Sequence, residues 1–118
     1  MTTLDLRTFG YRIYDAINER DAEALEKLFD PHVVRHATGE TGIEKAKQAM
    51  VGAFSIFPNM HFVVEDVLVD GNKFALRVTI HGIPTTIGEP QPTILEIFRI
   101  ENGRVVEIWG AGTMRQPT

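Results

Sequence analysis

Apolar positions in the first part of the chain recur at helical spacing. Phe9, Ile13 and Ile17 lie four residues apart and therefore share one face of a helix. We expect this first helix to be capped by Thr3 and to end near Asn18.

Two further helices are expected before residue 58. Asp21 is placed to cap a short second helix that ends before Pro31. Thr41 and Glu44 have the spacing of a capping box, which predicts a third helix running to about Phe57. The inward face of this third helix holds Ile43, Ala46, Met50 and either Phe54 or Phe57.

Beyond Pro58 the pattern changes to the alternation of β-strands. Residues 84–93 hold three of the six prolines and form a loop between two pairs of strands. Strands are expected in residues 61–69, 73–83, 94–100 and 104–109, with a brief extended segment at 33–37. Helices followed by antiparallel strands make an α+β fold. We expect a curved antiparallel sheet that wraps about three N-terminal helices and leaves a cone with an open mouth.

The turn between the last two strands decides which side chains share a face of the sheet. A three-residue loop at 101–103, with Gly103 in the left-handed conformation, would place Ile100 opposite Arg104. Residues of like parity would then lie on one face. The even-numbered face holds Ile94, Glu96, Phe98, Ile100, Val106, Ile108 and Gly110.

Glu96 is the single charged residue on that even-numbered face. If the face is enclosed, desolvation raises the pKa of its carboxyl group and fits it for general acid or base catalysis near neutral pH. Two alternatives remain open. A two-residue turn at 102–103 would place Glu96 beside Trp109 and Glu107, and a carboxylate at the rim of a sheet can simply reach solvent.

Composition narrows the classes of function. The 118 residues are sufficient for one domain, expected over 1–118, and the formal net charge of −4 argues against a nucleic-acid partner or an anionic membrane surface. The chain has no cysteine, which excludes disulfides and thiolate chemistry. No apolar run approaches the ~20 residues of a membrane span, and the N-terminal residues do not have the pattern of a signal peptide. A cytoplasmic location is therefore expected.

Three segments carry a resemblance to a known family. The first, "YDAINERDAEALEKLFDPHVVRHATGETGIE", places Tyr14 on a helix and His36 before the third helix. The second, "FPNMHFVVEDVLVDGNKFALRVTIHG", has an acidic pair and an Asp-Gly turn, and the third, "EIFRIENGRVVEIW", ends at Trp109. In this order they resemble the SnoaL-like polyketide cyclases, which belong to the nuclear transport factor 2-like superfamily of cystatin-like α+β cones.

The resemblance implies an apolar pocket, cofactor-free acid–base chemistry and a homodimer formed through the outer face of the sheet. Glu96 matches the polar residue of the penultimate strand. The acid that the family carries just after the last tryptophan would fall near Gly110, where this chain reads "WGAGT". The loop at 83–93 is also shorter than in the family, so we expect a reshaped or more open mouth.

The candidate site follows from these positions. Glu96 would abstract or return a proton, and His36 or Tyr14 would polarise a carbonyl oxygen. Substrate would contact Phe54, Phe57, Phe62, Phe98, Ile108 and Gly110. No metal site is expected, because no carboxylate or thiol completes a set of ligands with His32 and His36.

Two functions remain open, and it is undecided whether the chain is an enzyme. The first is a cofactor-independent cyclase, isomerase or dehydratase (a lyase) that acts on a small apolar carbonyl or polyketide-like substrate. The alternative is a non-catalytic module that binds a small ligand or a partner. Epoxide hydrolysis would need an Asp, Asn and Tyr set that the sequence does not place. A homodimer is expected through Leu95, Ile97 and Trp109 on the odd-numbered face.

Overall fold

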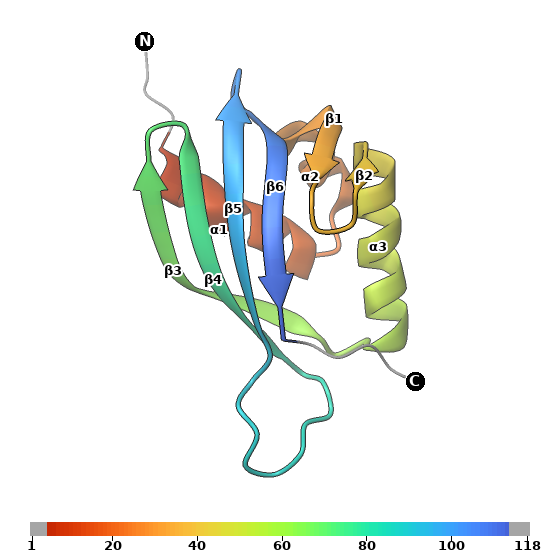
Figure 1. Cartoon of the computed structure of the whole chain (residues 1–118). Helices are drawn as coiled ribbons and strands as arrows, with labels where there is room; N and C mark the ends of the chain where they lie inside the picture. The colour runs from red at the N-terminus through yellow and green to blue at the C-terminus, as the bar shows by residue number, and fades with distance from the viewer. Residues whose placement is uncertain (1–4, 114–118) are drawn as a thin grey trace.

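The computed structural model describes residues 5–113, which form three helices and one six-stranded sheet (Figure 1). The helices are α1 (Leu6–Asn18), α2 (Ala22–Leu28) and α3 (Ile43–Ile56). The strands are β1 (Phe29–Arg35), β2 (Glu40–Thr41), β3 (His61–Asp70), β4 (Lys73–His81), β5 (Thr93–Glu101) and β6 (Arg104–Gly112). The expected α+β class is confirmed: the helices pack on one face of a curved sheet, in the manner of a cone.

The sheet is mixed, whereas the sequence pattern predicted an antiparallel one. The strand order is β2-β1-β6-β5-β4-β3, and β1 runs parallel to β6. The other neighbouring pairs are antiparallel. Sequence reasoning treated the segment around β1 as a brief extended piece, so it did not foresee that this strand pairs with the end of the chain.

The first two helices are capped by aspartates. The Asp5 carboxylate accepts hydrogen bonds from the backbone N–H groups of Arg7 and Thr8, so α1 begins at Leu6. The predicted cap, Thr3, lies outside the described residues. Asp21 caps α2 as predicted, by accepting from the backbone N–H of Ala24.

The predicted capping box at the start of α3 is wrong. Gly42, with a φ of 104°, is the N-cap residue, and it supplies no side chain to the helix. Thr41 belongs instead to β2, where it pairs with Val34. The Glu44 carboxylate lies 3.0 Å from Nζ of Lys47, one turn further along the helix. Pairing within the sheet has therefore overridden the local capping signal.

The β5–β6 turn has two residues rather than the three that we expected. Asn102 and Gly103 have φ angles of 51° and 77°, as a type I′ turn requires, and Glu101 lies opposite Arg104. The register then shifts at a bulge between Arg99 and Ile100.

This bulge decides which side chains face the core. Between the turn and the bulge, Ile100 pairs with Val105, which is fully buried. Val105 therefore faces inward rather than the predicted Val106. Beyond it, Glu96 lies opposite Gly110 and Phe98 lies opposite Ile108, so the predicted even-numbered face is correct in that region.

The core fills the concave side of the sheet. Phe74 and Phe98, from neighbouring strands, stack with ring centroids 5.0 Å apart, and Phe9 of α1 packs on Phe74 at 6.0 Å. Ile13 and Tyr14 lie in the same buried cluster. Burial of these apolar side chains holds α1 against the sheet and fixes the position of Tyr14.

Candidate functional site

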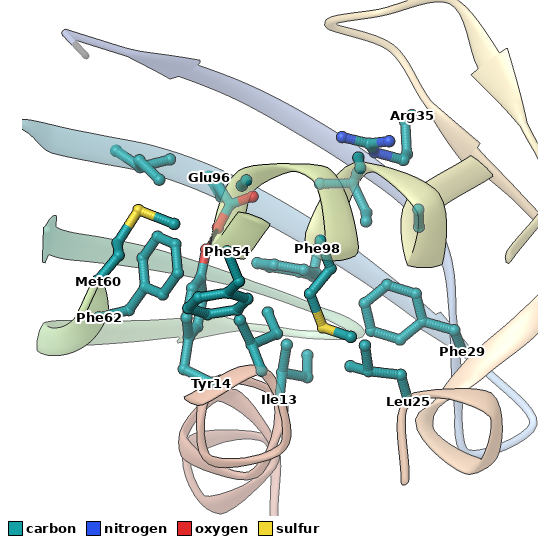
Figure 2. A pocket seen from close by; sticks show the side chains of 17 residues that line it. Ile13, Tyr14, Leu25, Phe29, Arg35, Phe54, Met60, Phe62, Glu96 and Phe98 are labelled. Carbon is teal, nitrogen blue, oxygen red and sulfur yellow. Dashed lines mark hydrogen bonds between the residues drawn. The ribbon is translucent and has the colours of Figure 1, made fainter. Parts of the chain in front are cut away.

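A cavity of about 210 Å³ lies between the concave face of the sheet and the helices (Figure 2). It is lined almost entirely by apolar side chains. The lining residues include Ile13, Ile17, Leu25, Phe29, Met50, Phe54, Met60, Phe62, Ile94, Phe98 and Ile108. Among the described residues, Glu96 and Arg35 are the two charged side chains that reach it, and Tyr14 contributes a hydroxyl.

Tyr14 and Glu96 form a hydrogen-bonded pair in the wall of the cavity. The Tyr14 hydroxyl, from α1, donates to Oε1 of Glu96, from β5 (Figure 2). Tyr14 is buried, and its ring packs on Phe62 with centroids 5.4 Å apart. These two predicted catalytic residues are therefore brought together although they are far apart in the sequence.

The environment shifts the pKa values of both partners. Desolvation by burial raises the pKa of Glu96 above its ordinary value, while the Tyr14 hydrogen bond and the charge of Arg35 act in the opposite direction. Burial, and then the Glu96 charge, raise the pKa of Tyr14 well above its ordinary value. Tyr14 is thus held as a neutral donor, and Glu96 is a stronger base than an exposed carboxylate.

Arg35 is a cavity residue that sequence reasoning missed. It ends β1, lies opposite Ile108 of β6, and its Nη1 atom donates to Oε2 of Glu40 at 3.1 Å. Alternation along the strand places Arg35 on the same face as Val33, which is fully buried. Sequence reasoning could have used this alternation only if residues 29–35 had been recognised as a strand of the sheet.

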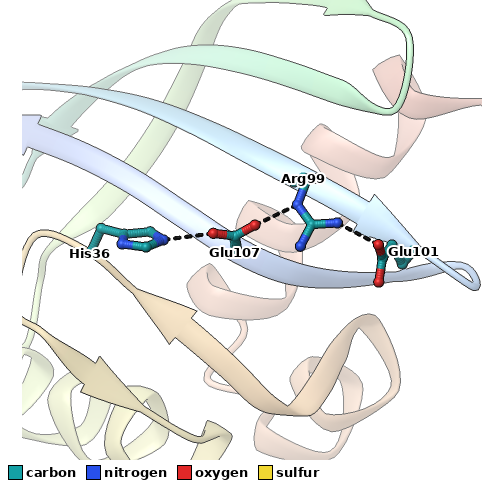
Figure 3. Close-up of polar contacts among 4 residues, drawn as sticks. All are labelled: His36, Arg99, Glu101 and Glu107. Carbon is teal, nitrogen blue, oxygen red and sulfur yellow. Dashed lines mark hydrogen bonds and ion pairs between the residues drawn. The ribbon is translucent and has the colours of Figure 1, made fainter.

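His36, which we expected to polarise a carbonyl oxygen of the substrate, does not line the cavity. Because Arg35 points inward, the next residue points to the outer face, where the His36 ring stacks on Trp109 with centroids 4.8 Å apart. Its Nε2 atom lies 2.8 Å from Oε2 of Glu107, and Nε of Arg99 donates to Oε1 of Glu107 at 2.5 Å (Figure 3). Arg99 also pairs with Glu101 at 2.6 Å. His36 and Arg99 together lower the pKa of Glu107.

Four of the six predicted substrate contacts line the cavity, and Phe57 and Gly110 do not. Phe54, Phe62, Phe98 and Ile108 are lining residues. Phe57 is the C-cap residue of α3 and packs against a cluster of Phe54, Met60 and Ile80 without lining the cavity.

A second compartment of about 390 Å³ adjoins the cavity. Gly110, the remaining predicted contact, lines this compartment together with Ala37, Ile80 and Gly112. Arg35 and Glu96 line both compartments. The two charged groups therefore lie where the compartments meet.

The outer face of the sheet carries a separate groove of about 570 Å³. Its apolar side chains Leu68, Leu95 and Ile97 are 71%, 59% and 45% exposed, and Trp109 lies beside them. Arg77 and Asp66 form an ion pair of 2.6 Å at its edge. Such a contiguous apolar surface is typical of a protein–protein interface.

Two further findings bear on the site. Within residues 5–113, no cluster of three or more His, Asp or Glu side chains is arranged to hold a metal ion. Over the same part of the chain, no helix is long and apolar enough to cross a membrane.

The sequence model of the SnoaL-like domain family matches residues 11–108 of the chain. No match is found among curated proteins. Among solved structures, wild-type IdmH, "a putative polyketide cyclase from Streptomyces antibioticus", is similar with a TM-score of 0.81 at 25% identity over 92% of each chain. TsrD from Streptomyces laurentii has a TM-score of 0.77 at 23% identity, over 93% of this chain and 91% of that one. "An uncharacterized cystatin fold protein" from Novosphingobium aromaticivorans has a TM-score of 0.75 at 16% identity, over 92% and 99%.

Proposed function

This chain belongs to the SnoaL-like domain family, and on that premise we propose that it is a cofactor-independent acid–base enzyme acting on a small apolar carbonyl compound. The observation that carries the proposal is the hydrogen-bonded pair of Tyr14 and Glu96 in the wall of an otherwise apolar cavity. A carboxylate in such a place is desolvated, which is how proteins tune a general base toward neutral pH.

The first step is removal of a proton from the carbon next to the carbonyl group. The Glu96 carboxylate takes the proton, the electrons of the C–H bond form the carbon–carbon double bond of an enolate, and the carbonyl oxygen becomes the oxyanion. Tyr14 is placed to turn its hydroxyl from Glu96 to that oxygen as the carboxylate becomes protonated. The positive charge of Arg35 stabilises the developing negative charge.

The enolate has three outcomes that need no cofactor. Return of the proton from Glu96 to another carbon moves a double bond, which is isomerisation. Attack of the enolate carbon on a second carbonyl of the same molecule closes a ring, and the new alkoxide takes the proton. Expulsion of a β-hydroxyl group, with that proton leaving as water, is dehydration.

The test measures the shared first step rather than one product. Wild-type protein is incubated with a panel of apolar ketones and β-diketones in D₂O, and exchange of the α-protons is followed by NMR. We expect Glu96→Gln to reduce the enzyme-dependent exchange by about a hundredfold or more. Glu101→Gln, an exposed carboxylate on the same strand, is the matched control and should exchange at the wild-type rate. Equal rates for wild type and Glu96→Gln would reject the proposal.

A second candidate is a ligand-binding module without catalysis. It is favoured by the glycine opposite Glu96, at the position where the family resemblance implied a second acid. Under this alternative the wild-type protein binds apolar ketones but does not accelerate α-proton exchange for any member of the panel.

We also infer that two copies of the chain associate through the outer groove defined by Leu68, Leu95, Ile97 and Trp109. These side chains form one apolar surface on the face of the sheet opposite the cavity. Burying that surface against a second copy would remove it from water without closing the cavity.

A further inference from the structure

We propose that the substrate carries a planar anionic group with two oxygen atoms, and that Arg35 binds this group where the two compartments meet. The inference rests on the proposed function in taking the cavity as the substrate site. It goes beyond that function by assigning a binding residue and a substrate class: an apolar molecule with a carboxylate or a β-dicarbonyl enolate.

The first argument is the placement of a guanidinium group against apolar walls. Arg35 is one of the two charged side chains, among the residues that the structure describes, that line either compartment. A charge that faces an apolar enclosure is costly unless it is paired. Arg35 already pairs with Glu40 through Nη1, and an anionic ligand group would add a second partner on the side of the cavity.

The second argument is that Arg35 has hydrogen-bonding capacity to spare. Its one ion pair within the described chain joins Nη1 to Oε2 of Glu40, and both side chains are partly exposed. The N–H groups of Nε and Nη2 have no protein partner within residues 5–113. These two groups form one edge of the guanidinium, and their parallel N–H bonds match a pair of oxygen atoms in one plane.

The third argument concerns the shape of the space on either side. The inner compartment extends from Arg35 toward Leu25 and Phe29, and the adjoining compartment extends toward Ala37 and Ile80. Both are lined mainly by apolar side chains. The anionic group would therefore lie near the middle of an elongated apolar molecule, close to Glu96, rather than at its far end.

A carboxylate and a β-dicarbonyl enolate share the same recognition chemistry, because each presents two oxygen atoms in one plane. They differ in what Arg35 does. For a carboxylate, Arg35 anchors a group that does not react. For an enolate, Arg35 holds the oxygens on which the charge of the reacting system rests, and so favours the ionised form.

The experiment measures binding of three probes at neutral pH by calorimetry: naphthoate, the enolate of the acyclic β-diketone benzoyltrifluoroacetone, and the neutral amide naphthamide. We expect wild-type protein to bind one or both anions about tenfold to a hundredfold more tightly than the amide. Arg35→Gln should abolish this preference while binding the amide as before. Arg12→Gln removes the same charge from an exposed position on α1 and should retain the preference.

Two further variants distinguish loss of anion binding from loss of the folded structure. Arg35→Lys keeps the charge but not the two parallel donors, so its preference should fall between those of wild type and Arg35→Gln. Glu40→Gln removes the carboxylate that partly neutralises the positive charge of Arg35 from the Nη1 side, so it should bind the anions more tightly than wild type does. Unchanged or weaker binding by Glu40→Gln would overturn the proposal even if Arg35→Gln did not fold.

The outcomes separate this inference from the proposed function. Equal affinity of wild type for naphthoate, the enolate and naphthamide overturns the inference, whatever the exchange assay shows. An anion preference that depends on Arg35, together with α-proton exchange that does not depend on Glu96, supports the inference and rejects the enzyme. Preference for one anion over the other identifies which group the substrate carries.

Discussion

Gly110 lies directly opposite Glu96 in the ladder between β5 and β6, and a Cβ atom at position 110 would stand 3.2 Å from Cγ of Glu96. That separation is shorter than ordinary van der Waals contact between carbon atoms. The missing side chain therefore leaves room for the conformation in which Glu96 accepts the hydrogen bond of Tyr14. Where the family resemblance implied a second acid, this chain has space instead.

The first prediction concerns Gly110→Ala. The added methyl group should push the Glu96 carboxylate away from Tyr14 and slow α-proton exchange by about tenfold or more, because small displacements of a catalytic group are costly. Gly52→Ala is the control, since a Cβ atom at that exposed position on α3 meets nothing within 4 Å. Wild-type exchange by Gly110→Ala would mean that Glu96 does not depend on the space opposite it.

The location of Glu96 on an enclosed face could be predicted because alternation along a strand is a local property. The exact pairing could not. The hairpin combines a two-residue turn at 102–103 with a bulge beside Ile100, and these together restore the parity that a three-residue loop would have given. The predicted even-numbered face was right for the residues farther from the turn than the bulge. Between the turn and the bulge, Val105 was assigned to the wrong face.

The errors at Arg35 and His36 have one physical origin. Arg35 ends β1 and His36 follows it, and the orientation of β1 is set by parallel pairing with β6, a strand near the other end of the chain. Long-range pairing of this kind leaves no local pattern in a segment so short. Once Val33 is known to be buried, alternation places Arg35 inward and His36 outward.

The second prediction concerns Tyr14→Phe. The Tyr14 hydrogen bond lowers the pKa of Glu96 against the effect of desolvation, so its removal should raise that pKa further. The rising limb of the pH dependence of kcat/KM should therefore move to higher pH, and the maximal rate should fall by about a hundredfold if Tyr14 also holds the oxyanion.

The control for Tyr14→Phe is Tyr11→Phe, which removes a hydroxyl from an exposed position on the same helix. It should leave both the pH profile and the rate unchanged. A Tyr14→Phe profile with the wild-type midpoint would show that Tyr14 does not act on Glu96. Loss of this hydrogen bond should also lower the free energy of unfolding by about 1 kcal/mol.

The third prediction concerns stability and pH. Burial raises the pKa of Glu96 above its ordinary value of 4.5, so the folded state holds the proton more tightly than the unfolded state does. The favourable contribution of protonated Glu96 is complete below the unfolded pKa and is lost as pH rises through the folded pKa. Glu96→Gln should therefore gain stability relative to wild type over that interval, by about 1.4 kcal/mol for each pH unit that separates the two pKa values.

Glu107→Gln supplies a control of opposite sign for that measurement. Hydrogen bonds from His36 and Arg99 lower the pKa of Glu107, so its contribution is present above the unfolded pKa and is lost as pH falls through the folded pKa. Urea unfolding of wild type and both variants from acid to neutral pH tests the two trends together. A constant difference between wild type and Glu96→Gln across this range would mean that Glu96 is solvated in the folded protein.

The last prediction tests association through the outer groove. Leu95 is 59% exposed and lines that groove, so Leu95→Glu would place a desolvated charge in the interface of two copies. We expect wild type to sediment as a dimer at micromolar concentration and Leu95→Glu to sediment as a monomer that keeps its fold. Ile87→Glu changes a fully exposed residue in the loop between β4 and β5, away from the groove, and should remain dimeric.

A monomeric wild type, or dissociation of both variants alike, would show that the groove does not join two copies. Because the cavity opens on the opposite face of the sheet from this groove, a monomeric Leu95→Glu that retains α-proton exchange would further show that each copy carries a complete site.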